Sequence, residues 1–171
     1  NLSLFPIAGI SVRRMAEWLH LRNLNDVDEL IEMGFVTPAA GHMIRLHPMM
    51  QEIAIADLKP SVKKCKMLLT NLQEICLAHG VDVPYFKPLF QTVENIIAYI
   101  EKDEPTFFLR FLEDVFPYME KYQYRLGMER VLFVLETAVP NYGSNEDRAL
   151  LLDYRATMEK NDQKAIKYEK D

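Results

Sequence analysis

The sequence predicts a mainly α-helical protein in which two short helices and a hairpin precede a longer series of helices. Apolar residues recur three and four positions apart over most of the chain, which is the period of an amphipathic helix. Only residues 35–46 contain short alternating runs separated by a turn, the pattern of a hairpin. Hydrophobic residues make up 49% of the 171 residues and charged residues 26%, which excludes a disordered chain and favours a packed core.

Two short helices are predicted first. Residues 11–21 place Val12, Met15 and Trp18 or Leu19 at helical spacing behind Ser11, a favourable N-cap. In the second helix Asn25 or Asp26 is expected to cap, and Gly34 is expected to end the helix in a left-handed conformation. Its inward-facing residues are expected to be Val27, Leu30 and Ile31.

A hairpin is predicted next, from Phe35 to Leu46, with its turn at residues 38–41. We expect it to contain all of the β-structure of the chain. The order helix, helix, hairpin is that of a winged helix, so we predict a winged-helix-like domain over residues 1–59.

Residues 60–171 are predicted to form helices alone. The first expected helix has about 19 residues and ends at Gly80, and later ones begin near Pro105 and Asn145. We expect Pro117 to kink or break its helix, and residues 140–143 to form a turn. Five helices with short connections suit an antiparallel helical-pair array, although either an open solenoid or a closed bundle fits the pattern.

The cysteines and histidines offer no metal site or disulfide. Cys65 and Cys76 fall on the apolar stripe of one predicted helix, about 16 Å apart along its axis, which is too far for a disulfide. The four histidines have no zinc-like spacing. No run of apolar residues is long enough to span a membrane, so we expect a cytoplasmic protein. Because the chain has no initiator Met, we expect it to continue beyond both ends.

Several short motifs carry a resemblance to a known family. LFPIAGIS, LIEMGFV and IRLHPMMQEIA resemble the winged-helix part of bacterial NB-ARC-type signal-transduction ATPases of the STAND class. FLEDVFPYMEKYQY, DRALLLDY and KAIKY are similar to the tetratricopeptide-type helices that follow it. The resemblance implies a helical array over residues 60–171 that contacts a protein partner. It also implies that residues 165–168 begin the second helix of a repeat.

The resemblance assigns a role to His47. In this family the winged helix packs on an upstream nucleotide-binding domain, and a histidine in a Met-His-Asp or Leu-His-Pro element reaches the ADP phosphates in the resting state. Leu46, His47 and Pro48 match the second form, which makes His47 the expected cofactor-binding residue for ADP or ATP held by the upstream domain. The alternative is that His47 caps or packs the helix that starts after it.

The residues present do not predict an enzyme. The chain has no Gly-rich loop ending in Lys and Ser or Thr, so we do not expect it to hydrolyse ATP. The acidic pairs at residues 103–104, 113–114 and 146–147 are adjacent in sequence, and we interpret them as solvated faces.

The alternative function is a winged-helix DNA-binding regulator with a helical sensor domain. Residues 23–33, the expected recognition helix, contain four carboxylates and no Lys or Arg. Residues 1–59 carry five Lys or Arg and seven Asp or Glu, a net charge of −2. Both features oppose binding to phosphates, so we expect a protein partner instead. A contact surface is expected near Pro117, formed by Tyr118, Tyr122 and Tyr124.

Overall fold

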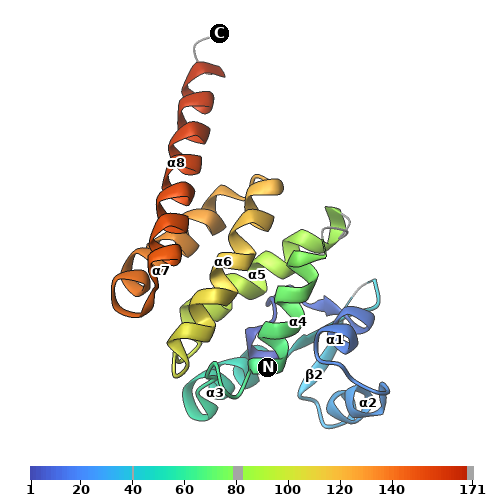
Figure 1. The fold of residues 1–171 in the computed structure, drawn as a ribbon. Helices are drawn as coiled ribbons and strands as arrows, with labels where there is room; N and C mark the ends of the chain where they lie inside the picture. Colours follow the sequence, from blue (N-terminus) through green and yellow to red (C-terminus); the bar gives the residue numbers. More distant parts are fainter. Residues whose placement is uncertain (40, 79–82, 169–171) are drawn as a thin grey trace. The chain divides into compact units, whose positions relative to one another are not determined.

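The computed structural model describes residues 1–39, 41–78 and 83–168, with the backbone alone for residues 83–86 and 164–168. The predicted class is confirmed: the described chain is mainly helical, with one small sheet (Figure 1). It forms two compact units, Asn1–Glu104 and Pro105–Asp171, which we call unit 1 and unit 2. Among the described residues, none of the helices is both long and apolar enough to cross a bilayer.

Unit 1 begins with a 3-10 turn, η1 (Leu2–Leu4), and a three-stranded sheet. The strands are β1 (Ile10–Ser11), β2 (Val36–Ala39) and β3 (Met43–Leu46). All pairings are antiparallel, and β3 lies between the other two. The helices of unit 1 are α1 (Val12–Trp18), α2 (Asn25–Glu32), α3 (Pro48–Leu58), α4 (Lys66–Leu77) and α5 (Val83–Tyr99).

The predicted helix signals of the first segment are largely confirmed. Ser11 caps α1, and its Oγ accepts a hydrogen bond from the backbone N–H of Arg14 at 3.3 Å. Gly34 follows α2 with a φ of +75°. The N-cap position of α2 is Leu24 and not Asn25 or Asp26, because the Asn23 side chain already accepts the N–H of Asn25.

The prediction that all β-structure lies between Phe35 and Leu46 is wrong. Strand β1 pairs Ile10 with Ile44, and an isolated bridge joins Ser61 to Glu101. The predicted turn also starts too early, because Pro38 and Ala39 belong to β2 and pair with β3. Proline is tolerated there because β2 is an edge strand.

The compact units divide the chain later than the predicted boundary between residues 59 and 60. Amide side chains from the later helices bind carbonyl groups of the first residues. Asn71 of α4 donates to the Trp18 carbonyl at 2.7 Å, and Asn95 of α5 donates to the carbonyls of Leu4 and Phe5 at 3.1 and 3.2 Å. Residues 60–104 therefore share a core with the sheet segment.

Gly9 is required where the chain enters β1, and this leads to a first prediction. Its φ is +98°, and a Cβ there would stand 2.7 Å from the carbonyl oxygen of Ile44, whereas Gly41, with a φ of +72°, faces open space. We expect Gly9→Ala to cost about 2 kcal/mol and the control Gly41→Ala about 1 kcal/mol, because a left-handed conformation alone costs roughly 1–2 kcal/mol. Guanidinium unfolding followed by fluorescence of Trp18, the single Trp, measures both. Equal losses would contradict the close contact at Gly9.

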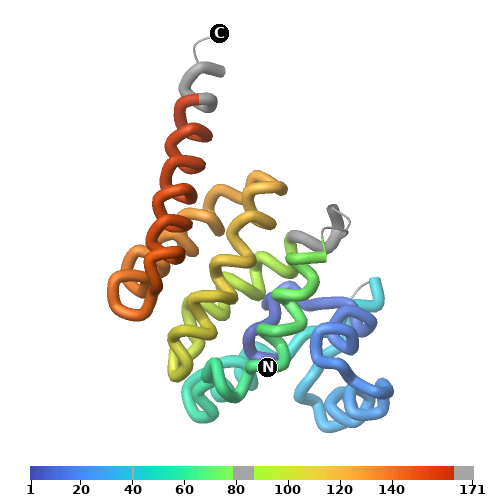
Figure 2. Tube along the Cα trace, in the orientation of Figure 1, coloured from blue at the N-terminus to red at the C-terminus, as the bar shows by residue number. Residues whose placement is uncertain are grey.

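Unit 2 consists of α6 (Pro105–Lys121), α7 (Arg125–Tyr142) and α8 (Asn145–Tyr168). The three helices run up and down in turn, with α7 packed on both α6 and α8 (Figure 2). Phe116 of α6 stacks on Tyr154 of α8 with ring centroids 4.0 Å apart. Each helix contributes to the core through residues at helical spacing, among them Phe111, Leu112, Val115, Met119, Val131, Leu135, Val139, Leu151 and Met158.

Four predicted helix boundaries are corrected. Pro117 lies inside α6 and Pro140 inside α7, so neither proline ends its helix, and residues 140–142 are helical and not a turn. Residues 165–168 continue α8 and do not begin a new helix. The helix predicted from Val62 starts at Lys66, because the N–H of Val62 donates to the Glu101 carbonyl. The end predicted at Gly80 lies outside the described residues.

Candidate functional site

His47 stands at the junction between β3 and α3, at the N-cap position of α3. Its backbone N–H donates to the carbonyl of Phe35 at 2.9 Å, and its own carbonyl accepts from the N–H of Gln51 at 3.0 Å. The first bond ties His47 to the residue before β2, and the second belongs to the first turn of α3. The backbone of His47 is therefore fixed on both sides.

The His47 side chain is exposed, as expected for a residue that acts outside its own unit. It does not cap α3 by a hydrogen bond. The alternative that the His47 side chain caps α3 would require such a hydrogen bond, and it is not formed. The contact of His47 with a nucleotide stays a prediction.

Helix α3 turns apolar side chains outward beside His47. Its buried residue is polar: the Gln51 amide donates to the carbonyls of Ser3 and Phe5 at 2.8 and 3.2 Å. Met49 and Ile53 are 64% and 45% exposed, and four residues apart they share one face of the helix. Exposed apolar side chains grouped on one helix face are suited to contact with another protein surface.

A groove of about 440 Å³ lies on unit 1 beside α3. The ammonium group of Lys64, which lines the groove, already donates hydrogen bonds to the carbonyls of Leu58 and Lys59 at 2.8 and 3.2 Å. The thiol that lines the groove is that of Cys65, and burial raises its pKa, which disfavours the reactive thiolate form. The groove therefore has a mainly apolar character and no activated nucleophile. Its walls include Leu2, Leu30, Phe35, Leu46, Met50 and Ala54.

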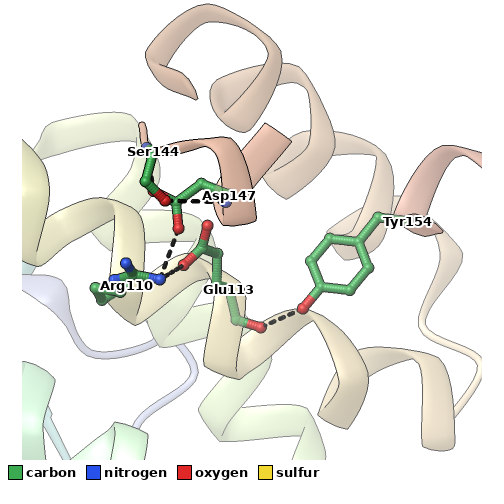
Figure 3. A network of polar contacts seen from close by, with 5 residues as sticks. All are labelled: Arg110, Glu113, Ser144, Asp147 and Tyr154. Carbon is green, nitrogen blue, oxygen red and sulfur yellow. Dashed lines mark hydrogen bonds and ion pairs between the residues drawn. The ribbon is translucent and has the colours of Figure 1, made fainter. Parts of the chain in front are cut away.

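A network of buried charges joins α6 to the beginning of α8 in unit 2 (Figure 3). Arg110 contacts Glu113 Oε2 at 3.0 Å and Asp147 Oδ1 at 2.6 Å. Glu113 and Asp147 are 5% and 3% exposed, while the Arg110 side chain is half exposed. Since a substrate could reach neither carboxylate, the network is suited to holding helices together and not to catalysis.

Ser144 and Asp147 cap α8 reciprocally. The N–H of Ser144 donates to Asp147 Oδ2 at 2.6 Å, and the N–H of Asp147 donates to Ser144 Oγ at 3.3 Å. This is the capping-box arrangement, with Asp in place of the more common Glu. One carboxylate thus both starts α8 and binds Arg110 of α6.

The two carboxyl groups differ in acidity. Burial, followed by the neighbouring charge of Asp147, raises the pKa of Glu113 from its usual 4.5 to about 7, although Arg110 opposes the change. Burial also disfavours the charge on Asp147, but the hydrogen bonds from Ser144 and the charge of Arg110 outweigh it and hold the pKa of Asp147 below its usual 3.8. Asp147 is therefore the ionised member of the pair.

The interpretation of the acidic pairs as solvated faces is wrong for Glu113 and Asp147. Glu113 lies four residues after Leu109 and three before Phe116, so it falls on a second buried face of α6. Asp147, with which Glu113 shares Arg110, lies 34 residues later in the sequence. The position of Glu113 next to Asp114 did not indicate this partner. The spacing of Ser144 and Asp147 was a local signal for Asp147, because it matches a capping box.

The expected tyrosine surface is also corrected. Tyr118 is 3% exposed and its ring meets that of Tyr122 edge-on at 4.9 Å, while Tyr122 and Tyr124 are half-buried. Among the aromatic side chains that the structure describes in unit 2, Phe133 of α7 is the most exposed, at 72%. On α2 the carboxylates of Asp26, Asp28, Glu29 and Glu32 are all exposed.

Within the part of the chain that the structure describes, no group of three or more His, Cys, Asp or Glu side chains could hold a metal ion. Comparison of the chain with protein families, with curated proteins and with solved structures gave no match. The site is therefore defined by the geometry of this chain alone.

Proposed function

We propose that this chain is the regulatory and protein-interaction segment of a nucleotide-dependent signalling ATPase of the STAND class. Residues 1–59 act as a winged helix that senses the nucleotide held by an upstream domain, and residues 60–171 act as a helical array that contacts a protein partner. The observation that carries the proposal is the setting of His47, whose backbone is fixed at the β3–α3 junction while its side chain is exposed beside an apolar helix face.

The chemistry of this setting suits a phosphate contact across a domain interface. An imidazole can donate a hydrogen bond to a phosphate oxygen. Because the backbone of His47 is fixed, only its side-chain rotamer must be ordered when the contact forms. Met49 and Ile53 would supply the apolar area that a covering domain buries. A contact made with only one nucleotide state shifts the equilibrium between closed and open forms by its differential affinity.

The exposed face of α7 supports the second half of the proposal. Leu126 and Phe133 are seven residues apart, so they lie on one side of α7, and they are 51% and 72% exposed. Aromatic side chains are enriched at protein interfaces. The alternative of DNA binding is disfavoured by the exposed carboxylates of α2, which would face the phosphate backbone.

The proposal predicts that His47 contributes little to the stability of this chain. We expect His47→Ala to change the free energy of unfolding by less than about 0.5 kcal/mol, because exposed side chains without structural contacts have effects of that size. Gln51→Ala on the same helix should cost about 1–3 kcal/mol, because it leaves the Ser3 carbonyl without its donor, while the Phe5 carbonyl keeps the Asn95 amide. Thermal denaturation of both variants measures the difference, and a loss for His47→Ala as large as that for Gln51→Ala would assign His47 a structural role.

The proposed function is tested by nucleotide binding in the complete gene product. We expect that protein to bind ADP with one site per chain, and residues 1–171 alone not to bind it, because the phosphate-binding domain lies upstream in this proposal. Isothermal titration with ADP distinguishes the outcomes. A complete product that binds no nucleotide would refute the proposal.

A further inference from the structure

Unit 2 holds two buried carboxyl groups beside a single guanidinium, and the proposed function makes no use of them. If Glu113 and Asp147 were both ionised, Arg110 could neutralise only one charge, and the other would remain in a site that excludes water. An uncompensated buried charge is strongly unfavourable, so such groups usually take up a proton.

The geometry shows where that proton would reside. Glu113 Oε2 contacts Arg110, while Glu113 Oε1 is buried without a hydrogen-bond acceptor or donor among the described residues. In Figure 3 the second oxygen of Glu113 points toward the carboxylate of Asp147. Asp147 Oδ2 accepts the Ser144 N–H, and Asp147 Oδ1 lies 2.6 Å from the Arg110 guanidinium as an ion pair, so both contacts favour the ionised form of Asp147. Asp147 Oδ1 has no hydrogen-bond donor among the described residues, so it can accept one from Glu113.

We propose that Glu113 carries a proton and donates it to Asp147, so that this shared proton holds the beginning of α8 against α6. The protonated carboxyl balances the charges, since one carboxylate and one guanidinium then remain. Because Asp147 also caps α8, a hydrogen bond from Glu113 to Asp147 would fix the first turn of α8 against α6. The inference does not depend on the nucleotide-sensing proposal.

Other titratable groups near the pair come from α6 and α8. Asp114 and Glu120 lie on α6, while Glu146, Asp153 and Tyr154 lie on α8. The Tyr154 hydroxyl donates to the backbone carbonyl of Glu113 at 2.8 Å, and burial raises its pKa, so it stays neutral throughout the range of interest. On α7, Arg125 and Glu136 form ion pairs with Glu129 and Arg155 and are engaged there.

The stability of unit 2 depends on pH because Glu113 holds its proton more strongly in the folded chain than in the unfolded chain. The folded chain holds the Glu113 proton up to about pH 7, whereas the unfolded chain releases it near the usual 4.5. Between these values the folded state binds more protons, so this group stabilises unit 2 fully below pH 4.5, and the stabilisation is lost as the pH rises through 7. The pKa of Asp147 is lowered in the folded chain, so Asp147 contributes stability above its usual pKa of 3.8 and loses that contribution as the pH falls below this value.

Glu113→Gln tests the proposal, because the amide imitates the protonated acid and cannot lose its proton. Between pH 4.5 and 8 the unfolding equilibrium constant of the wild type should rise relative to that of Glu113→Gln by a factor of about 140, within the limit of about 300 set by the difference between the folded pKa of about 7 and the usual 4.5. The variant should therefore be the more stable protein at pH 8. The control is Glu120→Gln, the same change at an exposed position of α6, and it should follow the wild type at every pH.

A direct measurement keeps the proposal testable if the variant folds poorly. The side-chain carboxyl carbon of Glu113 in the wild-type chain should titrate by NMR with a midpoint near pH 7. A Glu113 midpoint near 4.5, or parallel pH curves for the wild type and Glu113→Gln, would overturn the shared proton.

Discussion

Arg110→Met is expected to destabilise the chain by about 2–3 kcal/mol at pH 8, where Glu113 is ionised. Removing one partner of a buried ion pair typically costs about 3–5 kcal/mol, because the remaining charge is left uncompensated. We place the expected loss below that range because the Arg110 side chain is half exposed and its charge is screened by solvent. Methionine keeps most of the apolar stem, so the loss reports the missing charge.

Arg125→Met is the matched control, because Arg125 also contacts two carboxylates, those of Glu129 and Asp162. These side chains are 54%, 46% and 44% exposed, and exposed ion pairs contribute about 0–1 kcal/mol. Chemical denaturation followed by circular dichroism measures both variants. The loss for Arg110→Met should shrink at pH 5, where the Glu113 proton partly replaces the cation. Equal losses for the two arginines would contradict a buried network.

Phe111→Ala is expected to cost about 3–5 kcal/mol, the range observed when a buried aromatic side chain is removed from a core. Phe111 is fully buried in α6, and its ring lies 6.2 Å from that of Phe108. Phe133→Ala is the same substitution at an exposed position of α7, and it should change stability by less than about 0.5 kcal/mol. Thermal denaturation measures both, and a large loss for Phe133→Ala would mean that its ring is packed in solution.

Local signals in the sequence predicted much of the secondary structure. Ser11 marked the start of α1 because its hydroxyl can accept a backbone N–H, and Gly34 marked the end of α2 because it tolerates a positive φ. The alternation of Met43 to Leu46 predicted β3, since one face of that strand is buried. In each case the cause of the structure lies within a few residues of the signal.

Features that depend on distant partners could not be predicted in this way. Strand β1 has two residues and exists because Ile10 and Ser11 pair with β3, more than 30 residues later. The extent of unit 1 depends on Asn95, whose amide binds carbonyls 90 residues earlier. Pro117 stays within α6 because packing around the helix outweighs the lost hydrogen bond.

The candidate site was predicted in part. The role that the resemblance assigns to His47 required an exposed side chain, and the His47 side chain is exposed. The carboxyl pair was missed because a glutamate beside an aspartate suggests a solvated face, and only the packing of α8 on α6 buries it. Glu113 lies four residues after Leu109 and three before Phe116, and this helical spacing indicated that Glu113 faces the core.

The rate at which ADP leaves the complete gene product tests the proposed role of His47 most directly. His47→Ala should release ADP faster, by about tenfold if the contact contributes about 1.4 kcal/mol to the ADP-bound state alone. His42→Asn is the control, because His42 is exposed in the β2–β3 turn and Asn tolerates its φ of +58°. Stopped-flow release of a fluorescent ADP analogue should show faster dissociation from His47→Ala and an unchanged rate from His42→Asn. Release from His47→Ala at the wild-type rate would contradict nucleotide sensing by this residue.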